Sequence, residues 1–136
     1  MIVVDASVVI AALLPEAETV AARALLADET CVAPDLLVNE CVNALWRNVT
    51  AGHLLEHEGH EAVAVLTSAG IVLEPSLGLA GRALALSSTL DHPAYDCFYL
   101  ALAERRAAPM VTLDGKLARK AWGNAACRAS VRLLEP

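Results

Sequence analysis

Ile2-Val3-Val4-Asp5-Ala6-Ser7 is a short run of β-branched residues that ends at an acidic residue and a turn. The segment 8–14 that follows is entirely apolar and stops at Pro15, so the pattern predicts a strand, a turn and a short helix. A strand that is apolar at every position is typical of a sheet that helices cover on both faces. This opening therefore favours an α/β fold with a buried, parallel sheet.

The same alternation of short apolar strands and helical segments continues to the end of the chain. We expect further strands at residues 31–33, 71–73, 110–113 and 131–134. We expect helices at residues 16–28, 36–51 with Asp35 as the N-cap, 53–68, 79–90, 94–106 and 116–122. Crossovers of this length allow parallel pairing, so the predicted fold class is α/β, a three-layer α/β/α sandwich with a mostly parallel central sheet. No linker or repeat divides the chain, and we expect one domain over residues 1–136.

The composition is that of a chain with a large apolar core. Hydrophobic residues make up 57% of the 136 residues, which excludes a disordered or low-complexity chain. The longest apolar run is far shorter than the roughly 20 residues of a membrane span, so we expect no membrane association. Ten basic residues against 16 acidic ones give a net charge of −6, which argues against nucleic-acid binding through a broad basic surface.

The cysteines and the N-terminus indicate where the protein works. Four scattered cysteines form no Cys-x-x-Cys pair, so we expect reduced thiols rather than disulfides. No basic leader followed by a long apolar run is visible at the N-terminus. Both observations predict a cytoplasmic protein.

Four carboxylates are expected to meet at one edge of the sheet. Asp5 closes the first strand and Asp114 closes the fourth, and ligands of open parallel sheets bind beyond these carboxyl ends. Glu40 lies one to two turns into the helix that follows the second strand. Asp96 lies in the first turn of the helix opened by Pro93, among apolar neighbours, so we expect it to be buried.

Such a cluster of carboxylates lowers the stability of the fold, because like charges repel one another and raise one another's pKa values. A divalent cation relieves the repulsion, and ligands that offer only oxygen atoms favour Mg²⁺ or Mn²⁺. One or two such ions could hold a phosphodiester and its attacking water. We expect polar side chains around the acids to orient them or bound water, namely Ser7, Asn43 and Thr112.

A metal-free site of this kind repels phosphate, so binding of a nucleic acid there would require the metal. Candidate phosphate contacts are Arg47, on the polar face of the Glu40 helix, and three basic residues after Asp114, namely Lys116, Arg119 and Lys120. Each of these can equally be an ordinary surface charge.

Four segments in this order are similar to the motifs of the PIN-domain ribonucleases, and most similar to the VapC toxins of toxin–antitoxin pairs. They are Ile2-Val3-Val4-Asp5-Ala6-Ser7, Asn39-Glu40-Cys41-Val42-Asn43-Ala44-Leu45, the segment 92–103 beginning His92-Pro93-Ala94-Tyr95-Asp96, and Val111-Thr112-Leu113-Asp114. Together they span essentially the whole chain.

The resemblance implies an endoribonuclease that depends on Mg²⁺ or Mn²⁺ and cuts single-stranded regions of RNA, leaving 5′-phosphate and 3′-hydroxyl ends. It also implies that Asp5, Glu40, Asp96 and Asp114 are both the metal ligands and the catalytic residues, with Asp5 and Asp96 holding the principal metal. By the same resemblance we expect a homodimer that is neutralised by a cognate VapB-like antitoxin.

The sequence is compatible with two other interpretations. A PIN-like module that binds RNA or a protein without cutting is the main alternative, although retention of all four acids argues against it. Histidines at 53, 57 and 60 share a helical face and could bind Zn²⁺, but the intervening glutamates favour a solvated surface. We interpret His92, directly before Pro93, as a residue of the helix entry.

Overall fold

The computed structural model describes residues 1–136, and five short strands form its central sheet. The strands are β1 (Ile2–Val4), β2 (Cys31–Pro34), β3 (Val72–Glu74), β4 (Met110–Thr112) and β5 (Val131–Leu133). They lie in the order β3-β2-β1-β4-β5, and every neighbouring pair is parallel. The expectation of a mostly parallel sheet is confirmed.

Seven α-helices connect the strands. They are α1 (Ala6–Leu13), α2 (Thr19–Asp28), α3 (Leu36–Thr50), α4 (Glu56–Ser68), α5 (Ala80–Leu90), α6 (Ala94–Arg106) and α7 (Gly115–Trp122). Single 3₁₀ turns at Ser76–Leu79 and Arg128–Ser130 precede α5 and β5. None of the helices combines the length and the apolar character that crossing a bilayer requires.

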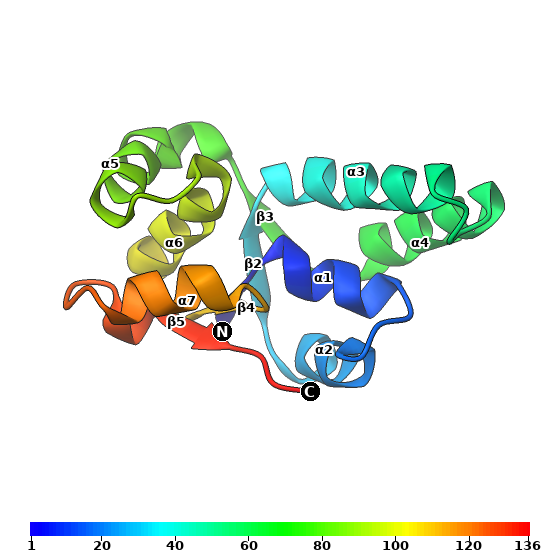
Figure 1. Ribbon diagram of the computed structural model, residues 1–136, viewed down its shortest axis with the longest axis horizontal. Coiled ribbons are helices and arrows are strands. Elements are labelled where there is room, and N and C mark those ends of the chain that lie inside the picture. Colours follow the sequence, from blue (N-terminus) through cyan, green and yellow to red (C-terminus); the bar gives the residue numbers. More distant parts are fainter.

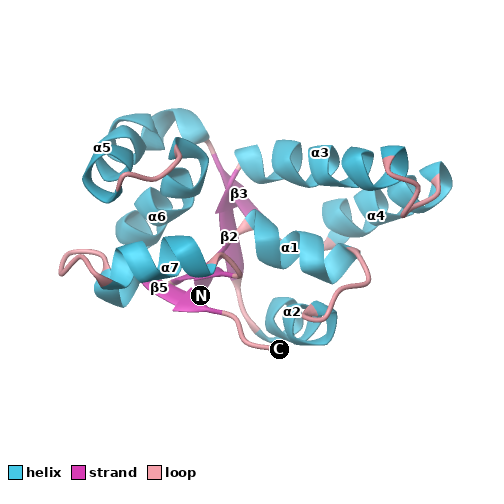
Figure 2. Ribbon diagram, in the orientation of Figure 1, coloured by secondary structure: helices cyan, strands magenta, loops and turns pink.

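The helices form two layers, one on each side of the sheet (Figure 1, Figure 2). Helices α1 to α4 lie on one side, whereas α5, α6 and α7 lie on the other. The chain moves outward from β1 through β2 to β3 and then returns to β4 on the opposite side of β1. Right-handed crossovers place the helices of these two directions on opposite faces, so the three-layer α/β/α prediction is confirmed.

The strand order creates a crevice between β1 and β4. Val4 lies beside Val111 in the register, and the backbone N–H of Asp5 donates to the carbonyl oxygen of Val111 at 3.1 Å. The residues that follow these two strands therefore emerge side by side. Parallel sheets bind ligands at such a switch point, where helices depart to opposite faces.

Two local expectations were wrong. The helix expected from residue 53 begins at Glu56, with Leu55 at the N-cap position. Asp35 precedes α3, but its side chain does not cap the helix. It accepts hydrogen bonds from the backbone N–H and the hydroxyl of Ser76 instead, at 3.1 Å and 2.6 Å, because the β2–β3 pairing brings that residue beside it.

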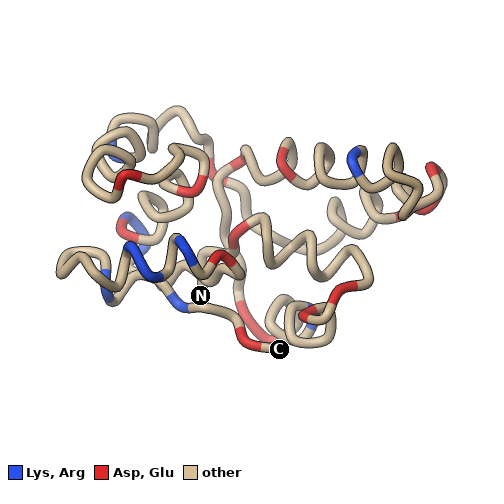
Figure 3. The backbone as a smooth tube through the Cα atoms, in the orientation of Figure 1, with Lys and Arg blue, Asp and Glu red and all other residues tan.

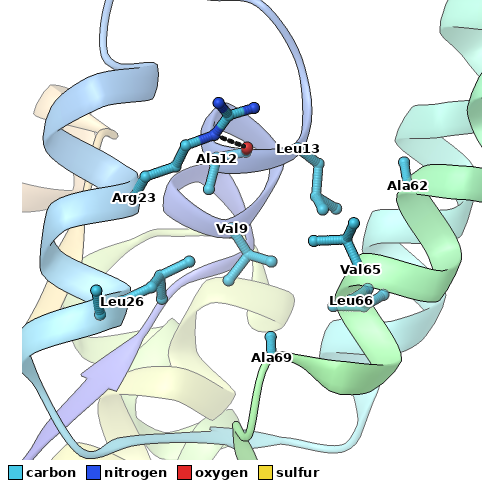
Figure 4. Close-up of a pocket in the computed structure, with 10 residues that line it drawn as sticks. Val9, Ala12, Leu13, Arg23, Leu26, Ala62, Val65, Leu66 and Ala69 are labelled. Atoms are coloured by element: carbon cyan, nitrogen blue, oxygen red, sulfur yellow. Dashed lines mark hydrogen bonds between the residues drawn. The ribbon is translucent and has the colours of Figure 1, made fainter.

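An apolar pocket of about 390 Å³ lies between α1, α2 and α4 (Figure 4). Val9, Leu13, Leu26 and Val65 are among its lining residues, and the Nε of Arg23 donates to the carbonyl oxygen of Ala12 at 2.9 Å. The side chain of Val65, which faces this pocket, stays 57% exposed. None of the four candidate acids lines the pocket.

Helix α6 contributes a continuous buried segment to the core. Its residues 99–103 are all buried, and the helix contacts β1, β2 and β4. The side chain of Leu100 is fully buried, whereas Leu84 on the neighbouring helix α5 is 67% exposed.

Replacing Leu100 with Ala should lower the free energy of unfolding by about 2–5 kcal/mol, because it leaves a cavity in the core. Leu84→Ala, the same chemical change at an exposed helical site, should stay within about 0.5 kcal/mol of the unaltered protein. Urea denaturation followed by circular dichroism measures both. Equal losses for the two variants would contradict this description of the core.

Candidate active site

Asp5 lies at the carboxyl end of β1 and is only 3% exposed. Its Oδ2 accepts hydrogen bonds from the hydroxyl of Ser7 at 2.7 Å and from the hydroxyl of Thr112 at 2.6 Å. Burial raises the pKa of Asp5 to about 6, the two hydroxyls oppose this shift, and the negative charge of Asp96 adds to it. The pairing of β1 with β4 thus places Ser7 and Thr112 around Asp5, as the sequence predicts.

Glu40 reaches the same edge of the sheet from α3. Its Oε1 accepts a hydrogen bond of 2.8 Å from the hydroxyl of Tyr99, a fully buried residue of α6. Burial, together with the charges of Asp5 and Asp96, raises the pKa of Glu40 to about 7, although the hydrogen bond from Tyr99 opposes this shift. The three carboxylates therefore lie close enough to feel one another's charge.

Asp96 is less buried than its sequence neighbours suggest, since its side chain is 25% exposed. The expectation of a buried Asp96 was wrong because burial along α6 begins only at Cys97, after the exposed residues Ala94 and Tyr95. Its Oδ2 lies 2.7 Å from Nε2 of His92, whose ring is buried.

Asp114 follows β4 and caps α7. Its Oδ1 accepts hydrogen bonds from the backbone N–H groups of Lys116 and Leu117, at 2.9 Å and 3.1 Å. Its other oxygen, Oδ2, lies 3.9 Å from Nε2 of His92. The helix N-terminus stabilises this carboxylate, so Asp114 has a structural role whatever else it does.

All four acids are held in the same way. Side-chain hydroxyls, the His92 ring or a helix N-terminus occupy one carboxylate oxygen of each, and the other oxygen receives none of these hydrogen bonds. Each acid thus keeps one oxygen free of these hydrogen bonds, and three of the acids, Asp5, Glu40 and Asp96, interact through their negative charges. This donor set fits Mg²⁺ or Mn²⁺.

Not all candidate ligands lie equally close. Single ligand atoms of His92, Asp96 and Asp114 lie within 4.8 Å of one another, so one ion could reach all three. Asp5 and Glu40 lie outside this tightest group and are linked to it through the charge of Asp96. Figure 3 shows acidic segments where α1 and α7 begin and along α3.

None of the four basic candidates pairs with the acids. Arg47 is exposed on α3, and the exposed Asn43 makes no hydrogen bond to the acids. Lys116 and Arg119 are exposed on α7, and the Nζ of Lys120 donates to the carbonyl oxygen of Asp91. Basic segments follow the acidic start of α7 in Figure 3.

Two residues of the site were missed in the sequence. Tyr99 lies three positions after Asp96 on α6, and His92 lies four positions before it. The three-residue spacing of Asp96 and Tyr99 puts both side chains on one face of α6, a signal that the apolar character of this helix concealed. His92 lies before Pro93, in the turn that precedes α6, so no helical spacing indicated its contact with Asp96. The histidines at 53, 57 and 60 are exposed, and His60 lies 4.0 Å from Glu56.

The metal-free protein should become more stable when the pH falls from about 8 to about 5. Asp5 and Glu40 have pKa values above their ordinary 3.8 and 4.5, so the folded state binds more protons and loses stability as the pH rises through about 6 to 7. In EDTA, we expect the melting temperature to rise by several degrees on acidification.

Asp5→Asn should raise the melting temperature at pH 8 and flatten its pH dependence, because it removes one of the repelling charges. Asp28→Asn, at an exposed position of α2, is the control and should change neither. A melting temperature that instead increases with pH, measured by differential scanning calorimetry, would contradict the repulsive cluster.

Comparison with known proteins identifies the family of this chain. Residues 2–123 match the family model of the PIN domain. The chain is 34% identical to ribonuclease VapC9 of Mycobacterium tuberculosis over 131 residues, covering 96% of this chain and 98% of that protein. It is 34% identical to ribonuclease VapC12 of the same organism, covering 92% and 95% of the two chains, and 31% identical to ribonuclease VapC3 of Pyrobaculum aerophilum, covering 88% and 93%. The chain therefore belongs to the PIN-domain family.

Proposed function

We propose that this protein is a metal-dependent endoribonuclease, a toxin of the VapC type that cleaves single-stranded regions of RNA. The observation that supports the proposal is the proximity of these carboxylates: Asp5, Glu40 and Asp96 interact through their charges, and single ligand atoms of Asp96 and Asp114 lie within 4.8 Å of each other. Relatives named as VapC ribonucleases, similar over nearly their whole length, support it.

The proposed metal ligands are Asp5, Glu40, Asp96 and Asp114, and the proposed ion is Mg²⁺ or Mn²⁺. When bound, such an ion lowers the pKa of a water molecule and stabilises negative charge on a phosphodiester. The raised pKa values of Asp5 and Glu40 support the ligand assignment, because burial and neighbouring negative charges both penalise the ionised carboxylates, a cost that a bound cation would offset.

Other side chains are proposed to orient the acids or to contact water and RNA. Ser7 and Thr112 hold one oxygen of Asp5, and Tyr99 holds one oxygen of Glu40, so that each free oxygen keeps a fixed direction. Asn43, three positions after Glu40 on the same face of α3, is proposed to bind water or RNA near it. The exposed Arg47, Lys116 and Arg119, with Lys120, are proposed to contact RNA phosphates beside the crevice.

The wider setting follows from the same proposal. We propose that residues 1–136 form one catalytic domain, that it forms a homodimer, and that a VapB-like antitoxin neutralises it. We further propose a cytoplasmic location, which the four free and buried cysteines support.

RNA cleavage should require Mg²⁺ or Mn²⁺ and should fall to background in Asp96→Asn, because a neutral amide is a poor ligand for a hard cation. Incubation of the purified protein with single-stranded RNA, followed by sequencing of the product ends, measures this. Asp91→Asn is a matched control, since it removes a nearby exposed charge at a left-handed position that Asn adopts readily.

Cleavage that survives EDTA would refute the metal-dependent mechanism. Binding of RNA without any cleavage, under all metal conditions, would replace the proposed enzyme with a non-catalytic binding module.

A further inference from the structure

His92 is a buried polar residue that is not among the four proposed metal ligands. Its side chain is 4% exposed, and its Nε2 lies 2.7 Å from Oδ2 of Asp96. Its other nitrogen, Nδ1, is buried and has no hydrogen-bond partner. Because only Nε2 has a hydrogen-bond partner, the two nitrogens are not equally suitable positions for the proton of the ring.

The geometry favours a proton on Nε2. An Nε2–H group donates to the carboxylate of Asp96 and leaves only a lone pair unpaired on Nδ1. A proton on Nδ1 would instead bury an orphaned N–H group, and buried N–H groups without partners are rarer than under-satisfied acceptors. In that tautomer Nε2 carries no proton, so its lone pair would face the negatively charged Oδ2 of Asp96 at 2.7 Å. His92 is therefore a hydrogen-bond donor to Asp96.

The backbone around His92 is held on both sides. Asp91 adopts a left-handed conformation with φ of 50°, and its carbonyl oxygen accepts from the Nζ of Lys120. The backbone N–H of His92 donates to the carbonyl oxygen of Ser87 at 3.2 Å, and Pro93 follows with its restricted φ. The imidazole thus extends from a rigid turn between α5 and α6.

Asp96 is the partner that needs such support. It stands in the first turn of α6 with a side chain that is 25% exposed, so that without a donor its carboxylate could rotate toward solvent. The hydrogen bond fixes Oδ2 and leaves Oδ1 available. Ligating carboxylates are commonly oriented by such neighbouring donors, and loss of a donor typically weakens metal binding 10- to 100-fold.

We propose that His92 is a positioning residue: its Nε2–H group fixes the Asp96 carboxylate in the orientation that binds the metal ion. This inference rests on the proposed metal centre. It differs from direct ligation, in which the Nε2 lone pair of His92 would itself bind the ion and the Asp96 hydrogen bond would be lost.

The test measures Mn²⁺ binding to the full chain by isothermal titration calorimetry, without RNA. His92→Phe keeps a flat ring but has no donor, and it should bind Mn²⁺ 10- to 100-fold more weakly than the unaltered protein. His92→Gln, which offers an amide donor, should recover most of the affinity. The melting temperatures of the metal-free variants should stay close to that of the unaltered protein, which a merely structural role of His92 would not allow.

A second pair of variants keeps the test decisive if His92→Phe does not fold. His92→Met and His92→Gln are unbranched and similar in length, and only Gln carries a donor, so Met should bind Mn²⁺ more weakly. Equal Mn²⁺ affinities within this pair, or an unchanged affinity in His92→Phe, would overturn the proposal.

Pulsed electron paramagnetic resonance of the Mn²⁺-loaded protein separates positioning from ligation. We expect no directly bound imidazole nitrogen, and a ¹⁴N coupling that disappears in His92→Gln would overturn the proposal in favour of ligation. Failure of the unaltered protein to bind Mn²⁺ would overturn the proposal together with the metal centre. Normal Mn²⁺ binding without RNA cleavage would refute only the proposed function.

Discussion

The burial of neighbouring carboxylates at the carboxyl edge of the sheet is the constraint on which the rest of this structure depends. Asp5 is buried with a pKa near 6, and Glu40 has a pKa near 7, because burial and neighbouring negative charges both oppose ionisation. The fold tolerates this cost by placing a donor against one oxygen of every acid. We expect this arrangement to lower stability in the absence of a cation, and it leaves one oxygen of each candidate ligand without such a donor.

The topology makes that arrangement possible. Because β1 is central and β4 pairs with it directly, the chain ends two strands at one crevice and sends helices to both faces there. Helix α3 brings Glu40 from one layer, and α6 brings Tyr99 and Asp96 from the other. The hydrogen bond between Tyr99 and Glu40 therefore joins the two helical layers across the candidate site.

Local sequence patterns were sufficient for most of the secondary structure and for the four acids. The limits expected for the helix at residues 94–106 are those of α6, since a proline opens that helix and its core face is continuous. The start of α4 was misplaced by three residues, because His53 and Leu54 are compatible with either a turn or a helix. The role of Asp35 was misjudged, because its partner Ser76 lies 41 positions away in the chain.

The sequence by itself determined a parallel α/β sheet with acids after β1 and β4, because apolar periodicity and strand ends are local properties of the chain. Only the tertiary structure decided which donors hold those acids. The contact of Thr112 with Asp5 spans 107 positions, and that of Tyr99 with Glu40 spans 59. Such pairs follow from strand order and helix packing, and no local pattern encodes them. Even for His92, four positions from Asp96, only the tertiary structure shows that the ring is buried and contacts the carboxylate.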